Sequence, residues 1–312
     1  MEFYLGSGEK RFINKTLIRE LEDKYNIHCM FGAVKSSYVY GIQNATSDRD
    51  SIIVYQSEHQ REIFQALIEE NAVDIIFMNF DYIINNQELY LSHVQDYPSC
   101  LYRKGKQKKV SSNAFRDDFC TEVIFECLAS NCIWDSGYIR KNFNQLLQSI
   151  SIKAVADYYF SRAYGNYKNN LQKDMVLNQK YMTTLIGICC IKWICKKYTI
   201  PNLNYKSLVE EYVPDEFIPF FLDILSEHKK NEKAIDNVMN YHYRAVNSER
   251  IEEAKSEKPK AYTKSNEAVN QWLYNQINEV KDIIIDLPEN ARFSLSFEEW
   301  ISSKDLIQIR EE

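Results

Sequence analysis

The sequence predicts an α+β protein in which a small mixed β-sheet is followed by a mostly α-helical region. Short apolar runs of the strand type gather in the first third of the chain, at 27–33, 52–55 and 73–80. From residue 115 onward, apolar residues recur with the 3.6-residue period of amphipathic helices. Glycine and proline are scarce, with 8 and 6 of 312 residues, which favours long helices and few tight turns.

The predicted elements of the first part alternate between helix and strand. The pattern indicates a helix over 16–25, a strand over 27–33, a short helical turn at 38–40, a strand after Asp50, a helix over 58–70, a strand over 73–80 and a helix over 82–95. A strand–helix–strand order places the strands on either side of the 58–70 segment next to each other in one sheet.

The second part is predicted to be helical throughout. We expect helices over 115–129, 138–164, 178–197, 205–213, 216–240 and 266–285, with a break at 165–167. This division predicts two domains, 1–112 with the sheet and 113–312 with the helices and a C-terminal tail. Apolar residues in the tail, Trp300 among them, predict that it docks either on the body of the protein or on a protein partner.

Composition excludes several classes of protein. A net charge of −6 gives no protein-wide basic field for duplex binding, although it leaves room for a local basic groove. No stretch reaches about 18 apolar residues, and the N-terminus lacks the apolar core of a secretory signal, so we expect a cytoplasmic protein with no membrane segment. The eight cysteines form no C-x-x-C pair and are expected to be buried apolar groups, and the scattered histidines argue against zinc.

The segment 36–55, SSYVYGIQNATSDRDSIIVY, carries the most chemistry. Asp48 and Asp50 are one residue apart at the start of an apolar run, so in a strand they share one face. Two carboxylates at this distance repel each other unless a cation lies between them. Oxygen ligands on a stiff element suit Mg²⁺, which binds one or two carboxylates together with nucleotide phosphates.

The spacing of SSYVYG, five residues and then SDRD resembles the signature of the DNA polymerase β-like nucleotidyltransferase superfamily. It is most similar to the RNA-ligase-associated branch of stand-alone enzymes. The resemblance implies a palm-like nucleotidyltransferase domain in the first part, in which Asp48 and Asp50 bind Mg²⁺ or Mn²⁺. It also implies nucleotide-binding roles for the small residues of the segment, which are Ser36, Ser37, Gly41 and Ser47. Ser36 stands where the family has a glycine that lets the backbone approach the triphosphate.

In that superfamily a third carboxylate on a neighbouring strand completes the site, as a metal ligand or a base. The resemblance makes Asp74, at the start of the predicted 73–80 strand, the best match in this chain. Asp81, at the end of the same strand, is the second choice. The alternative for either residue is an ordinary aspartate at the end of a surface strand.

The helical half also resembles this branch, which has a lysine–tyrosine pair on a helix before a tryptophan and a proline. Lys180 and Tyr181 fit this outline, so the resemblance implies that Lys180 contacts the phosphates and that Tyr181 lies near the base. The alternative is a surface lysine beside a core tyrosine. Arg162 and Tyr164 are weaker candidates of the same kind.

A basic segment lies between the two predicted domains. It contains five basic residues within 103–109, of which Arg103, Lys104, Lys106 and Lys108 are the candidate nucleic-acid contacts. A solvated loop is the alternative.

Taken together with these features, the resemblance implies a template-independent nucleotidyltransferase. The enzyme would transfer NMP or dNMP from a nucleoside triphosphate to a nucleic-acid 3′ end or growing oligonucleotide and release pyrophosphate, in RNA repair or phage defence. Protein-modifying nucleotidyltransferases of toxin–antitoxin type and nucleotide-binding pseudoenzymes are the alternatives. The departure at Ser36 is the main support for a pseudoenzyme.

Overall fold

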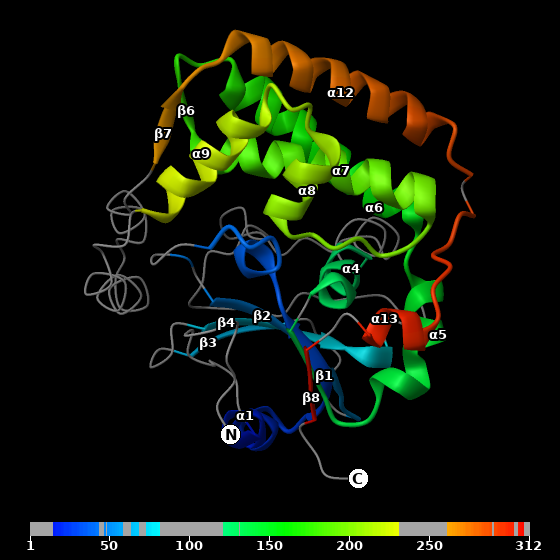
Figure 1. Cartoon of the computed structure of the whole chain (residues 1–312). Coiled ribbons are helices and arrows are strands. Elements are labelled where there is room, and N and C mark those ends of the chain that lie inside the picture. Colours follow the sequence, from blue (N-terminus) through cyan, green and yellow to red (C-terminus); the bar gives the residue numbers. More distant parts are fainter. Residues whose placement is uncertain are drawn as a thin grey trace, which may run out of the picture.

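The computed structural model describes residues 15–43, 47, 49–58, 64–68, 73–81, 121–130, 132–230, 261–288, 290–302 and 305–308. Within these ranges a mixed β-sheet lies beneath a layer of helices, and helix α1 (Lys15–Tyr25) covers its opposite face (Figure 1). Four strands of the sheet precede the helical region in the chain, so the predicted α+β class is confirmed.

The sheet has six strands in the order β3-β4-β2-β1-β5-β8. Their bounds are β1 (His28–Val34), β2 (Arg49–Gln56), β3 (Phe64–Ile68), β4 (Val73–Asn79), β5 (Cys132–Asp135) and β8 (Asp305–Gln308). The pair β1 and β2 is antiparallel, whereas β2 and β4 run parallel. The three strands predicted in the first part are therefore confirmed as β1, β2 and β4.

The helix predicted over 58–70 is wrong, because Phe64–Ile68 forms strand β3. This strand pairs antiparallel with β4 at the edge of the sheet. Apolar residues at 63, 64, 67 and 68 fit a helical period, but a short apolar run also fits a strand, and backbone pairing with β4 decides between them. Because β3 lies outside β4, the strands β2 and β4 are still neighbours, as the sequence predicted.

The apolar run of β2 is buried on both faces of the sheet. Ile53 and Tyr55 pack toward α1, whereas Ile52 and Val54 pack toward the helical layer, and all four side chains have 0% exposure. A strand that is covered on both faces needs apolar residues at every position, which explains why 52–55 does not alternate with polar residues.

The helical layer is built around α7 (Asn178–Lys197), which packs against α6 (Ile152–Asn166), α8 (Tyr205–Tyr212), α9 (Ile218–Lys229) and α12 (Glu267–Ile285). Nearer the sheet lie α4 (Thr121–Ala129), α5 (Ile139–Ser149) and the short α13 (Phe297–Ile301) (Figure 1). A two-stranded ribbon of β6 (Met175–Leu177) and β7 (Tyr262–Lys264) joins α12 to the start of α7.

Several predicted helices are confirmed, and α7 has the predicted bounds 178–197. The segment 138–164 is two helices, because the Ser151 side chain accepts a hydrogen bond from the amide of Ala154 and starts α6 there. The predicted break at 165–167 is wrong, since α6 continues through Asn166 into a π-helix, η4 (Tyr167–Leu171). The Asn166 amide donates to the Thr183 hydroxyl at 2.9 Å, which ties this point to α7.

The C-terminal tail docks on the body, one of its two predicted locations. Trp300 is 2% exposed, and its indole N–H donates to the carbonyl oxygen of Leu128 at 2.8 Å. After α13, strand β8 adds to the sheet beside β5. The predicted domain boundary at 112, the predicted 82–95 helix and the basic segment lie outside the described residues. Strand β5 carries the second part of the chain into the sheet.

The composition predicted buried cysteines and no membrane segment. Cys29, Cys127, Cys189 and Cys190 are buried thiols, as predicted. Among the helices in the described ranges, none is long and apolar enough to cross a bilayer.

Gly32 gives a test of the packing at the centre of the sheet. A Cβ atom at this position would lie 2.3 Å from the carbonyl oxygen of Ile52 and 2.4 Å from the Trp134 ring. We therefore expect Gly32→Ala to lower the free energy of unfolding by about 2–4 kcal/mol, measured by urea denaturation.

The control is Gly165→Ala in α6, where a Cβ would meet nothing within 4 Å. This change is expected to raise the free energy of unfolding by about 0.5–1 kcal/mol, because alanine favours a helix over glycine. Equal effects of the two substitutions would contradict the packing described for β1.

Candidate active site

The candidate site lies where β2 and β4 begin. Asp50 and Asp74 are direct partners in the parallel pairing of these strands, so they stand level with each other on neighbouring strands, which are about 4.8 Å apart. Asp48, two residues before Asp50, lies outside the described residues. Asp81 lies beyond the opposite end of β4, seven residues after Asp74 in the chain. The structure thus brings Asp74, and not Asp81, beside Asp50.

The turn at 36–42 connects β1 to the chain that leads into β2. Its entrance is fixed to the candidate site, because the amide of Lys35 donates to the carbonyl oxygen of Asp50 at 3.0 Å. A short 3₁₀ helix, η1 (Ser36–Tyr38), follows, and the amide of Ile42 closes the turn on the carbonyl oxygen of Ser37 at 3.0 Å. The predicted nucleotide-binding serines, Ser36 and Ser37, therefore lie beside the start of β2.

Ser36 has a left-handed backbone conformation, with φ of +59°. A residue with a side chain costs about 1–2 kcal/mol in this region, whereas glycine adopts it without strain. The turn thus keeps the backbone geometry suited to the glycine of the related enzymes while carrying a serine. The serine that replaces the family's glycine at position 36 therefore carries backbone strain that a glycine would not carry.

Gly41 is required by close packing at the other end of the turn. Its φ is +65°, and a Cβ atom would lie 2.9 Å from the side-chain amide of Asn204. Beside it, the carbonyl oxygen of Tyr40 accepts a hydrogen bond from the amide of Tyr205 at 2.8 Å. The glycine of the motif therefore lets the turn contact the start of α8.

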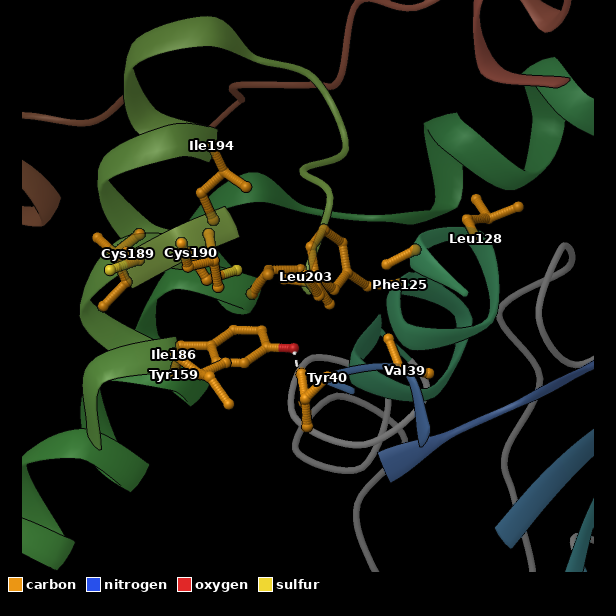
Figure 2. Packing of buried hydrophobic residues seen from close by; sticks show 14 of the residues in the cluster. Val39, Tyr40, Phe125, Leu128, Tyr159, Ile186, Cys189, Cys190, Ile194 and Leu203 are labelled. Carbon is orange, nitrogen blue, oxygen red and sulfur yellow. Dashed lines mark hydrogen bonds between the residues drawn. The ribbon is translucent and has the colours of Figure 1, made fainter. Parts of the chain in front are cut away.

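Tyr40 joins the turn to the helical layer through a buried polar network. Its hydroxyl group donates to the Glu126 carboxylate of α4 at 2.5 Å and lies 3.2 Å from the hydroxyl group of Tyr159 of α6. Figure 2 shows Tyr40 and Tyr159 pointing toward each other, surrounded by apolar residues such as Ile186 and Leu203. Burial, followed by the nearby Glu126, raises the pKa of Tyr40 well above its ordinary value, so Tyr40 stays a neutral hydrogen-bond donor.

Arg162 supplies the positive charge of this network. One of its guanidinium N–H groups donates to the hydroxyl group of Tyr158 at 3.2 Å. Burial alone would lower the pKa of Arg162, but the neighbouring groups Tyr40, Tyr158, Glu126 and Tyr159 together outweigh burial, and the net pKa is raised. Arg162 is therefore a cation at any physiological pH.

The predicted pair Lys180 and Tyr181 is split between two environments. Lys180 is half-buried at the start of α7, and burial, together with Arg162 and Lys173, lowers its pKa. Like charges held near one another in this way suit an anionic ligand. Tyr181 is 0% exposed and donates to the Asn270 side chain at 2.8 Å, which is the position of a core tyrosine. A contact between Tyr181 and a nucleotide base stays a prediction that its burial does not support.

Two further candidate residues, Ser47 and Tyr164, lie in the described part of the chain. Ser47 is half-exposed beside the start of β2, and Tyr164 is 43% exposed on α6, with its ring stacked on that of Phe160. Arg103, Lys104, Lys106 and Lys108 lie outside the described residues.

Sequence reasoning missed Glu126 and Tyr159. The available signal was a single carboxylate within the apolar run 123–129 of a predicted helix, since a charged group in such a run requires a buried partner.

The strain at Ser36 can be measured against its neighbour. Ser37 lies outside the left-handed region, so Ser36→Gly and Ser37→Gly add the same freedom to the unfolded chain but only Ser36→Gly relieves strain. We expect Ser36→Gly to be more stable than Ser37→Gly by about 1–2 kcal/mol in urea denaturation. Equal stabilities of the two variants would mean that Ser36 is not strained.

The helical part of the chain is similar to a known protein family. Residues 121–275 match the family model described as "RNA repair pathway DNA polymerase beta family". This span runs from α4 into α12, so it contains Glu126, Tyr159, Arg162 and Lys180 but not the aspartates of β2 and β4.

Among curated proteins, the Uncharacterized protein YcgL of Bacillus subtilis (strain 168) is 22% identical over 270 residues, covering 84% of this chain and 95% of that protein. The alignment therefore includes most of both chains, although the identity is low. The family match confirms the predicted resemblance: residues 121–275 are similar to the RNA repair pathway branch of the polymerase β-like nucleotidyltransferases.

Proposed function

We propose that this protein is a Mg²⁺- or Mn²⁺-dependent nucleotidyltransferase that adds NMP or dNMP to a nucleic-acid 3′ end without a template and releases pyrophosphate. The family match points to nucleotidyltransferase activity in general. The observation that carries the more specific proposal is the parallel register of β2 and β4, which sets Asp50 level with Asp74 beside the turn at 36–42.

The residues fit a divalent metal ion. Carboxylates at neighbouring positions on two stiff strands, with Asp48 close in sequence, form the hard oxygen donor set that Mg²⁺ prefers. Without a cation these groups would repel one another and raise each other's pKa. Bound Mg²⁺ would neutralise phosphate charge and stabilise the attacking and leaving oxygens of an in-line displacement.

The other residues of the site would position the nucleotide. Backbone N–H groups of the Ser36–Ser37 turn would hold the β- and γ-phosphates, and Lys180 would add a positive charge from the helical layer. Asp74 would accept the proton of the attacking hydroxyl group. These tasks are positioning and charge stabilisation, which supply most of the catalysis in nucleotidyl and phosphoryl transfer.

A nucleic acid is the acceptor that we favour. The five basic residues within 103–109 provide a local positive segment in a chain of net charge −6. Either RNA repair or phage defence would use such an activity.

The direct test is transfer from α-³²P-labelled NTPs and dNTPs to RNA and DNA oligonucleotides in the presence of Mg²⁺ or Mn²⁺. We expect Asp50→Asn and Asp74→Asn to lose about 10³-fold or more in kcat/KM, since each removes a carboxylate that stabilises transition-state charge through the metal. Asp81→Asn, at the other end of β4, separates the two candidate carboxylates and is expected to stay within about threefold of the wild type.

Full transfer by Asp74→Asn together with loss in Asp81→Asn would exchange the roles of these two residues. Wild-type protein that binds nucleotide without any transfer would instead support a pseudoenzyme. Transfer to a protein substrate alone would establish the protein-modifying alternative.

The basic segment makes a separate prediction about the acceptor. Changing Lys104, Lys106 and Lys108 to glutamate should weaken oligonucleotide binding and flatten its salt dependence, because fewer counterions are released on binding. A matched variant changes three exposed lysines of α7, α8 and α9 (Lys196, Lys206 and Lys229) to glutamate, so that net charge falls equally. Affinity would be measured by fluorescence anisotropy at several salt concentrations. An equal loss of affinity in both variants would show that the basic segment is not part of the acceptor site.

A further inference from the structure

We infer that Glu126 is a positioning residue for the nucleotide-binding turn, which it holds in place through the hydroxyl group of Tyr40. The inference rests on the proposed function and deepens it, because it gives the helical layer a task in shaping the site on the sheet.

The first observation is the burial of two polar groups against each other. Glu126 is 4% exposed and Tyr40 is 2% exposed, and their oxygens are 2.5 Å apart. A carboxylate taken out of water is costly unless it accepts strong hydrogen bonds, and bonds to a charged oxygen are shorter and stronger than neutral ones. Glu126 therefore holds the Tyr40 hydroxyl group firmly.

The second observation is that the network joins separate parts of the chain. Glu126 comes from α4, while Tyr159 and Arg162 come from α6. The half-buried Arg162 is close enough to Glu126 to interact with it electrostatically, which favours a carboxylate at this buried position. The network thus fixes Tyr40 relative to two helices at once.

The third observation is that Tyr40 has little freedom left. Its amide donates to the carbonyl oxygen of Ser36 at 3.3 Å, and its carbonyl oxygen accepts from Tyr205 at 2.8 Å. Ser36 is the residue in the left-handed conformation, and it directly follows Lys35, whose amide is bonded to Asp50. A shift of the Tyr40 ring would therefore move the backbone that is proposed to hold the phosphates.

A purely structural role would not need a carboxylate. An apolar side chain of similar size would fill the same space, and replacing buried ionic groups by apolar ones is often neutral or stabilising. The Tyr40–Glu126 hydrogen bond is directional, so it fixes one position of the Tyr40 ring among those that the apolar core would accept.

The test compares Tyr40→Phe, Glu126→Leu and Glu126→Gln with a control, Ser136→Ala. Ser136 is half-buried, and its hydroxyl group donates to the carbonyl oxygen of Cys29 at 2.9 Å, at the end of β1 that is far from the turn. For each variant we would measure the urea midpoint, kcat and KM for the nucleotide, and hydrogen exchange of the amides at 36–42.

We expect Tyr40→Phe and Glu126→Leu to raise KM about ten- to a hundredfold and to speed exchange at 36–42 by a similar factor, the effect of losing a buried bond to a charged group. Glutamine can still accept from the Tyr40 hydroxyl group, so Glu126→Gln should recover most of the loss. Ser136→Ala should lower stability without changing KM or exchange in the turn.

Unchanged KM and exchange in Glu126→Leu and Tyr40→Phe, with wild-type transfer intact, would overturn the role of Glu126 alone. Equal changes in Ser136→Ala would also overturn it, since loss of stability would then explain them. Wild-type protein that neither transfers nor binds nucleotide would overturn the proposed function, and the exchange data would then report only on the packing of the turn.

Discussion

The amide of Lys35 donates a hydrogen bond to the carbonyl oxygen of Asp50. This bond fixes the start of the turn that follows β1 to the start of β2. At the other end of the same turn, Tyr40 and Gly41 are fixed to α4, α6 and α8. The turn at 36–42 is therefore held at both ends, once by the sheet and once by the helices. The position of the phosphate contacts proposed on this turn follows from this arrangement.

The sheet supplies the second half of the site through strand order. Because β3 pairs on the outer side of β4, the chain returns to place β4 directly beside β2, in parallel. Burial on both faces then fixes the register, since a slip of one residue would exchange the apolar side chains that face α1 and the helical layer. Asp50 and Asp74 are level with each other as a consequence of apolar packing further along the same strands.

The sequence predicted much of this and failed for identifiable reasons. The uninterrupted apolar runs of β1, β2 and β4 and the continuous apolar surface of α7 were strong local signals. The segment 58–70 was misjudged because its apolar spacing fits both periods, and only pairing with β4 selects the strand. Tyr40 and Glu126 are 86 positions apart in the chain, and the paired residues of β1 and β5 are further apart still. The pairing of β8 with β5 depends on the docked tail. Local periodicity carries no information about such partners, so the helical anchoring of the turn could be seen only in three dimensions.

The central claim is that the aspartates at the starts of β2 and β4 form one metal site. Its most direct test is the number of Mn²⁺ ions bound per chain in the presence of a non-hydrolysable nucleoside triphosphate, measured by electron paramagnetic resonance. We expect the wild type to bind metal together with the nucleotide and Asp50→Asn and Asp74→Asn each to lose at least one of the bound ions. Undiminished Mn²⁺ binding in a folded Asp50→Asn/Asp74→Asn double variant would contradict it.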